Sequence, residues 1–286
     1  MAVTVGQNAG ILKLSRQLGQ VSDRISNSFV RLSSGQRISK ASDDSSGLAV
    51  ADSLQLNTRL ASIAIRNAND GISSVTIADN AMKEIQSILQ RQSELAQQAA
   101  NGTFSLAQRS VIQTEFTALG SEVERIATGT NFNGIALLSG SGAITFQVGI
   151  DTTSLSQLAI ENVQGTLQQL GLATAGSSAL SYSLSGATTD AAQSASRSAL
   201  VAVTDALTSL SLKRATLGAI ETRLQATVNN LSVARENFTA AEARIRDLDV
   251  AQEAAQLTRL SILQQAGSAI FAQANQSTAL ALQLLK

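Results

Sequence analysis

Apolar residues near the amino terminus recur at alternating spacings of three and four, a pattern typical of a coiled-coil helix whose stripe faces a partner. Only Ser28 interrupts the stripe. The same pattern returns between Val75 and Leu89 and again between Ile112 and Ile126, which predicts two further helices. The members of the amino-terminal stripe are Ile11, Leu14, Leu18, Val21, Ile25 and Leu32.

The strongest repeat lies towards the carboxyl terminus, in a helix expected to begin after Asp190. Large apolar residues recur there at every seventh position, and small residues such as Ala234 and Ala241 fill companion positions. The last segment, 257–286, is amphipathic. Because one thin subunit cannot bury both terminal stripes, the ends must pair with each other, with other copies, or with both. The heptad seam consists of Leu217, Leu224, Leu231, Phe238 and Ile245.

The middle of the chain has a different character. Asn133-Gly134 is a strong turn signal, and Ile144, Phe146, Val148 and Ile150 alternate with the period of a strand, which predicts one arm of a short hairpin. Residues 164–189 are rich in Gly, Ser, Ala and Thr with little periodicity, so a surface excursion is expected. The fold class is therefore mainly α: long antiparallel helices in a coiled-coil or helical bundle, with a small β-hairpin region.

Two local signals mark helix starts. Ser105 and Gln108 fit a capping box, directly after the turn expected at residues 101–103. Ser42 or Asp43 is expected to cap the helix that follows the Ser- and Gly-rich stretch 32–50, and acidic side chains suit the positive end of a helix.

Composition narrows the functional classes. The 286 residues include no Pro, Cys, His or Trp, so nothing interrupts long helices, and neither disulfides nor thiolate or imidazole metal sites are available. Lys and Arg balance Asp and Glu, 21 against 21, without the basic run that a nucleic-acid partner needs. No segment is expected to cross a membrane, and no Sec-type signal is expected at the amino terminus.

Few residues are candidates for catalysis or for binding a metal or phosphate. Asp43 and Asp44 invite a calcium-loop or a catalytic-carboxylate interpretation, but position twelve of such a loop is Leu54, and no nucleophile and base accompany the pair. The Gly pair at 140–142 lacks the strand–turn–helix context of a phosphate loop. We expect no active site, no cofactor and no metal. O-linked sugars on the Ser- and Thr-rich middle remain an alternative.

The chain resembles the bacterial flagellins at both ends. The amino-terminal resemblance runs through "RLSSG", "RI", "DD" and "GLA" between Arg31 and Ala49, and continues in "RNANDGIS", "ELAQQAANGT" and "NFNGIALLSG". The carboxyl-terminal resemblance is "VNNLSVAREN" and "EARIRDLDVAQEAAQLTRLSILQQAGSAIFAQAN". The chain departs from the family where Ser277 and Thr278 replace the customary Pro. Residues 141–192 leave no room for large outer domains.

The resemblance implies a structural subunit that polymerises into the flagellar filament for motility. Residues 1–42 with 249–286 would form an inner tube and residues 43–248 an outer tube, with an excursion at about 130–192. The chain would be secreted unfolded through the flagellar type III apparatus, with an export chaperone and cap or junction proteins as partners. The alternatives are a hook–filament junction protein of the same superfamily and a secreted coiled-coil adhesin.

Two sets of residues are candidate sites. Arg37 and Lys40 against Asp43 and Asp44, facing residues 244–249, would make a polar joint between the two tubes. The resemblance also implies a patch that a host innate immune receptor, Toll-like receptor 5, recognises on related chains, with Leu95 as an exposed apolar anchor. The matching residues of that patch are Arg91, Glu94, Leu95 and Glu115.

Overall fold

The structure is a computed structural model and describes residues 9–140, 142–161 and 163–283. It divides into two compact units. Unit 1 joins both ends of the chain, Met1–Thr58 with Glu236–Lys286, and unit 2 is the central segment Arg59–Arg235. The amino-terminal residues on which the expectation of no Sec-type signal rests lie outside the described part, as do the side chains of Ser277 and Thr278.

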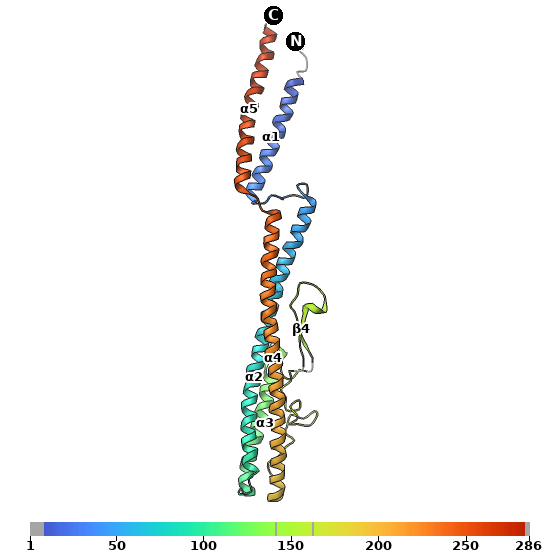
Figure 1. Cartoon of the computed structure of the whole chain (residues 1–286), viewed down its shortest axis with the longest axis vertical. Helices are drawn as coiled ribbons and strands as arrows, with labels where there is room; N and C mark the ends of the chain where they lie inside the picture. The colour runs from blue at the N-terminus through green and yellow to red at the C-terminus, as the bar shows by residue number, and fades with distance from the viewer. Residues whose placement is uncertain (1–8, 141, 162, 284–286) are drawn as a thin grey trace. The chain divides into compact units, whose positions relative to one another are not determined.

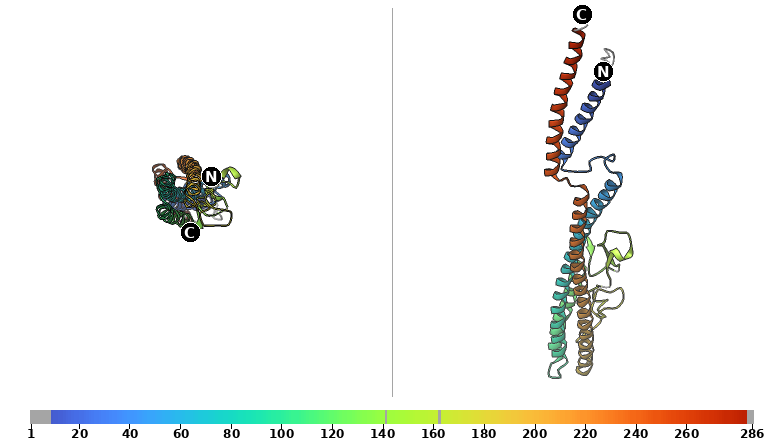
Figure 2. Two further views of the ribbon diagram at one scale, coloured as in Figure 1. Left: turned by 90° about the horizontal axis from the view of Figure 1, so that it is seen from below. Right: turned by 45° about the horizontal axis from the view of Figure 1, so that its top comes forward.

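Unit 1 is built around two terminal helices, α1 (Ala9–Ser34) and α5 (Val250–Gln283). They run antiparallel and side by side in Figures 1 and 2, so the predicted pairing of the two ends is present within one chain. The contact is thin: Ser28 is the one buried residue among those described in α1, and Leu260 is 3% exposed in α5. Gly267 lets α1 approach, because a Cβ there would lie 2.7 Å from Leu18 Cδ2.

Unit 2 contains most of α2 (Ser45–Ala99), all of α3 (Leu106–Gly129) and most of α4 (Thr189–Arg246), which run alongside one another (Figures 1 and 2). The predicted capping box is confirmed: Gln108 N–H donates to Ser105 Oγ, and the Gln108 side chain accepts the Ser105 N–H. Apolar side chains of all three helices share one core. The α class is therefore confirmed.

Two short antiparallel hairpins follow α3. Strands β1 (Asn131–Phe132) and β2 (Ile135–Ala136) pair across the predicted turn, in which Asn133 and Gly134 take left-handed φ values of 51° and 78°. Those values suit Asn-Gly and match the twist of the strands.

The second hairpin pairs β3 (Ile144–Gln147) with β4 (Gln157–Ile160), and a 3-10 turn, η1 (Ser154–Ser156), precedes β4. The expected strand is shorter than its alternation indicates. The N–H groups of Val148 and Gly149 both donate to the carbonyl of Ser156, so two residues oppose one, as in a β-bulge, and regular pairing stops there. Ile150 consequently lies outside the strand.

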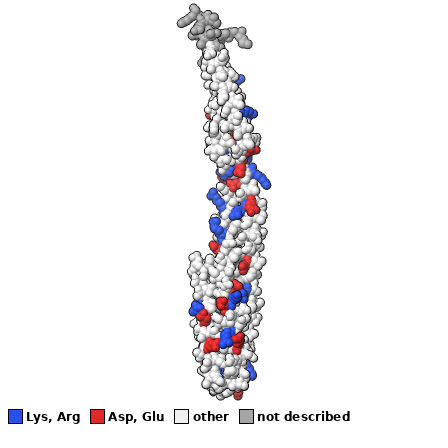
Figure 3. Space-filling model, turned by 90° about the vertical axis from the view of Figure 1, so that its left-hand side faces the viewer, with Lys and Arg blue, Asp and Glu red and all other residues white. Residues whose placement is uncertain are grey.

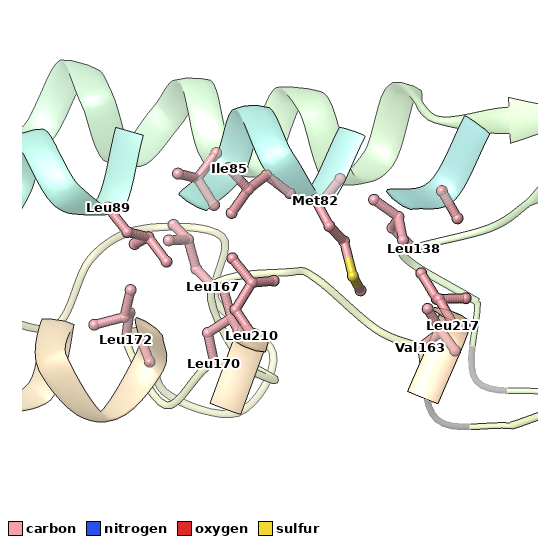
Figure 4. Packing of buried hydrophobic residues seen from close by; sticks show 14 of the residues in the cluster. Met82, Ile85, Leu89, Leu138, Val163, Leu167, Leu170, Leu172, Leu210 and Leu217 are labelled. Atoms are coloured by element: carbon pink, nitrogen blue, oxygen red, sulfur yellow. The ribbon is translucent and has the colours of Figure 1, made fainter. Parts of the chain in front are cut away.

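Residues 163–188, which we call the strap, are not the simple surface excursion that their composition indicates. The strap has little regular structure, yet its leucines enter the core between α2 and α4 (Figure 4). Its backbone is held by side chains of the helices: Glu124 accepts the N–H of Leu167 at 2.9 Å, and Lys213 Nζ donates to the carbonyl of Gln164 at 2.5 Å. The buried hydrophobic residues of the strap are Val163, Leu167, Leu170, Leu172 and Leu184.

The heptad seam of α4 is buried over part of its length. Leu217 and Leu224 are fully buried in unit 2, whereas Leu231, Phe238 and Ile245 are half-buried. None of the described helices combines the length and apolar character needed to cross a membrane.

Candidate functional site

Backbone hydrogen bonds join the segment that follows α1 to the segment that links α4 with α5. Helix α1 ends before Gly35, whose φ of 69° suits glycine, and α4 ends at Arg246, just before α5 begins. Gln36 forms an antiparallel bridge with Asp247, and the Arg37 N–H donates to the Arg246 carbonyl at 2.7 Å. Both interruptions are therefore part of one structured junction.

Arg37 also donates through its side chain. Its Nη2 lies 2.6 Å from the carbonyl of Ile245, one of the α4 carbonyls that lack an intrahelical partner. A cation is favourable at this end of a helix because the helix dipole is negative there. Arg37 thus caps α4 and lies against the 244–249 segment.

Asp43 organises the turn between α1 and α2. Its Oδ2 accepts the N–H groups of Ser39 and Lys40, each at 3.2 Å, and its Oδ1 lies 3.4 Å from Arg31 Nη2. These interactions, with the Ser39 N–H first, hold the pKa of Asp43 below its ordinary 3.8. The expected pairing of this carboxylate with Arg37 or the Lys40 ammonium is wrong, because backbone donors and Arg31 occupy it.

Asp44 caps the amino terminus of α2. The prediction that Ser42 or Asp43 is the capping residue is therefore wrong. Its Oδ1 accepts the Gly47 N–H at 2.9 Å and the Ser46 hydroxyl at 3.0 Å. The pKa of Asp44 is lowered mainly by the Gly47 bond, and Arg37 contributes the smallest part. The two adjacent carboxylates therefore stabilise local structure.

A polar pocket of about 650 Å³ lies between α1 and α5 next to this junction. Four arginines and three carboxylates line it, together with Ser28. The Ser28 hydroxyl donates to Glu253 Oε1 at 2.5 Å, which accounts for the polar interruption in the α1 stripe. The charged lining residues are Arg24, Arg31, Arg37, Arg244, Asp247, Asp249 and Glu253.

In unit 2 the structure brings three of the four receptor-patch residues together at the surface. Arg91 donates to Glu115 at 2.9 Å and to Glu94 at 3.0 Å, and the three side chains are 50%, 47% and 68% exposed. The pKa of Arg91 is raised, first by the hydrogen bond to Glu115. Leu95 is different: it is 1% exposed and belongs to the core. The expectation of an exposed Leu95 anchor is wrong, because Leu95 lies on the buried stripe of α2.

Two arginines of unit 2 hold elements together and were not singled out from the sequence. Arg214 of α4 makes a two-pronged contact with Asp79 of α2, with N–O distances of 2.8 and 3.2 Å, and bonds Gln86 at 2.6 Å. Arg109 is fully buried and donates to the carbonyls of Asn101 and Thr189. The signal for Arg109 was its place on the same helical stripe as Ile112 and Phe116.

Charges are unevenly divided between the two terminal helices, and α1 carries Lys13, Arg16, Asp23, Arg24 and Arg31. Along α5 the acidic and basic residues are Glu253 and Arg259. On the face of the molecule that Figure 3 shows, uncharged surface predominates and charged side chains of both signs are scattered over it. Large apolar side chains of α1 and α5 are exposed, including Leu12 at 55%, Ile262 at 60% and Ile270 at 58%. Large exposed apolar side chains that gather on one surface are typical of sites that contact protein or a membrane.

Comparison with known proteins identifies the same family at both ends of the chain. Residues 5–143 match the family described as bacterial flagellin N-terminal helical region, and residues 200–285 match the bacterial flagellin C-terminal helical region. A crystal structure of Bacillus cereus flagellin aligns with 58% of this chain and 88% of its own, at 25% identity and a TM-score of 0.48.

Relatives that match over nearly their full length belong to the same family. A flagellin of Halalkalibacterium halodurans is 37% identical over 283 residues, which cover 99% of each chain. The flagellin of Bacillus subtilis is 37% identical over 304 aligned positions, and the flagellar filament 33 kDa core protein of Treponema phagedenis is 34% identical over 293, each with 99% of both chains covered. These matches do not favour a junction protein or an adhesin. The chain belongs to the bacterial flagellins, the structural subunits of the flagellar filament.

Proposed function

We propose that copies of this chain assemble through the apolar faces of α1 and α5. Residues 1–42 with 249–286 then form the inner wall of a tube, and residues 43–248 form the outer wall. The observation that carries the proposal is the thin core of the terminal pair, where Leu12, Ile262 and Ile270 remain more than half exposed. Burying each such side chain contributes about 1.5–3 kcal/mol, so contact with further copies is strongly favourable.

The junction around Arg37 is the polar joint between the two walls in this proposal. Arg37, Asp43 and Asp44 satisfy backbone groups at the helix ends, and Lys40 contributes its backbone N–H. A joint built from hydrogen bonds and caps keeps both helix interruptions defined while the apolar faces stay available for other copies.

The filament to which this family contributes lies outside the cell. We propose that the chain reaches it through the flagellar type III apparatus with help from an export chaperone, and that cap and junction proteins contact it at the filament ends. The support is the exposed apolar surface of α5, which needs cover before assembly. The sequence also contains neither Pro nor Cys, so refolding after export needs no prolyl isomerisation or disulfide formation.

A pair of charge-matched variants tests the assembly surface. Ile262→Asp places a carboxylate on the apolar face of α5, whereas Gln264→Glu adds the same charge at an exposed polar position two residues away. Purified monomers are exposed to a salt jump, and polymer is counted by negative-stain microscopy and sedimentation. We expect filaments from the wild type and from Gln264→Glu, and none from Ile262→Asp. Normal filaments from Ile262→Asp would contradict the proposed surface.

We also propose that the exposed charge cluster of Arg91, Glu94 and Glu115 is recognised by Toll-like receptor 5 when the chain is monomeric. The support is the exposure and mutual orientation of the three side chains. Leu95 supports the patch from within the core and is not a contact of this proposal.

Reporter-cell dose curves with monomeric protein test this second role. Arg91→Ala is expected to weaken activation by at least tenfold, about 1.4 kcal/mol of binding free energy. The matched control is Arg125→Ala on α3, which removes another exposed arginine that is paired with a glutamate, Glu122. Superimposable curves for Arg91→Ala and the wild type, or equal losses for both variants, would contradict the patch.

A further inference from the structure

We propose that Asn133 is a site of spontaneous covalent modification, at which the neighbouring Gly134 converts the side-chain amide to aspartate and isoaspartate. The proposal is independent of assembly. It rests on the different surroundings of the two Asn-Gly pairs in the sequence, Asn101–Gly102 and Asn133–Gly134.

The turn between β1 and β2 leaves both reacting groups accessible. Asn133 and Gly134 are exposed, and apart from the two chain neighbours of Gly134 nothing lies within 4 Å of the position that a Cβ on this glycine would occupy. Among the residues that the structure describes, neither the side chain of Asn133 nor the N–H of Gly134 has a hydrogen-bond partner. The nucleophile and the amide carbon are therefore free of competing interactions.

The hairpin that carries the turn is short. Two residue pairs, Asn131–Ala136 and Phe132–Ile135, form the β1–β2 ladder, and one more bond, from the Leu137 N–H to the Thr130 carbonyl at 3.0 Å, follows it. A two-stranded ladder of this length opens locally at low cost in free energy, and opening lets the backbone nitrogen of Gly134 approach Cγ of Asn133.

The other Asn-Gly pair is held in place. Asn101 Oδ1 accepts the N–H of Thr103 at 3.2 Å, and the Asn101 carbonyl accepts Nη2 of the buried Arg109 at 2.9 Å. Moving the Asn101 side chain towards Gly102 breaks the first bond, and moving the backbone leaves a buried guanidinium without one of its acceptors. This pair is consequently an internal control within the same molecule.

The reaction is balanced with water as the co-reactant. The Gly134 nitrogen gives up its proton and bonds to Cγ of Asn133, while the bond from Cγ to Nδ2 breaks and the departing nitrogen leaves as ammonia. Water then opens the five-membered imide at either carbonyl. One product is aspartate at position 133, and the other is isoaspartate, in which the main chain runs through the side-chain carbon. No oxidant or reductant is involved.

Either product changes the surface beside α2. Asn133 lines a cavity of about 290 Å³ that Asp70 and Ser74 also line, so the new carboxylate joins an existing one. Aspartate tolerates the left-handed backbone of the turn, whereas isoaspartate lengthens the main chain and does not fit a two-residue turn. The net charge of the chain changes from zero to negative, so modified molecules separate on isoelectric focusing.

The test follows the native full-length protein in mildly alkaline buffer, with peptide mapping by mass spectrometry that separates aspartate from isoaspartate. We expect both products at position 133 to accumulate at least about fivefold faster than at position 101, because the 133 turn opens more readily. In urea, where the fold is lost, the two sites should react at similar rates. Asn133→Ser should remove most of the acidic species on isoelectric focusing and leave the slower reaction at position 101.

Three results would overturn the proposal. Equal reaction at the two sites in the native protein, or a faster reaction at position 101, would remove the structural preference. A preference that persists unchanged in urea would assign it to local sequence. Aspartate without isoaspartate at position 133 would exclude attack by the Gly134 nitrogen, since only the imide yields both products.

Discussion

The hydroxyl of Ser28 donates a 2.5 Å hydrogen bond to Glu253, and this contact between α1 and α5 involves the one buried residue among those described in α1. A coiled-coil stripe is ordinarily apolar, so a serine in the seam is unfavourable unless it has a partner. The half-buried carboxylate of Glu253 supplies that partner. The terminal pair thus combines a thin apolar contact with one specific polar contact.

This contact predicts an asymmetry between single and double variants. Ser28→Ala leaves the Glu253 carboxylate without its donor and should weaken α1–α5 pairing by about 1–2 kcal/mol, whereas removing both groups in Ser28→Ala/Glu253→Ala should cost less. Amide exchange across α1 and α5 measures the pairing. Additive losses in the double variant would show that the two residues do not interact.

Replacing Arg214 tests the two-pronged contact between α4 and α2. Arg214→Lys keeps the charge but cannot bond both oxygens of Asp79 and also reach Gln86, so the free energy of unfolding should fall by about 1 kcal/mol. Arg223→Lys, an exposed position on the same helix, is the control and should change little. Both values come from denaturant unfolding followed by circular dichroism. Equal stability of the two variants would rule out a structural contribution from the Arg214 contact.

Two glycines of α3 should respond to alanine in opposite directions. A Cβ on Gly120 would lie 2.3 Å from Leu180 Cδ1 of the strap, so Gly120→Ala should destabilise unit 2 by about 1–3 kcal/mol. Gly129 has no atom within 4 Å of its Cβ position, and Gly129→Ala should be neutral or stabilise by up to about 1 kcal/mol. Thermal unfolding compares the two. A stable Gly120→Ala protein would mean that the Leu180 side chain does not pack tightly against Gly120.

The cap of α2 should make the junction sensitive to acid. The folded-state pKa of Asp44 lies below its ordinary 3.8, so the cap stabilises the fold above that pH and is lost as the pH falls through the lowered pKa. Asp44→Asn keeps an acceptor for the Gly47 N–H without titrating, so this contribution should become independent of pH. Amide exchange at Gly47 and Leu48 between neutral pH and pH 3 measures the effect. Identical acid responses of the two proteins would contradict the assignment of the cap.

Local patterns in the sequence were sufficient to predict the helices and several of their ends. The capping box at Ser105 and Gln108 and the turn at Asn133-Gly134 depend on neighbouring residues alone, and both are present in the structure. The apolar stripes at the two ends predicted pairing with each other, with other copies or with both, and the structure has α1 beside α5.

Only the tertiary structure decided which residues the helices bring together. The strap looks like a loop by composition, yet Leu167 and Leu172 are fully buried, because sparse leucines in an irregular segment carry no periodic signal. The partners of Arg37 depended on where α4 ends, far away in the sequence, whereas Asp43 bonds the nearby Ser39, Lys40 and Arg31. Leu95 lay inside a motif interpreted as a surface, but it continues the buried stripe of α2, which the helices packed against α2 cover.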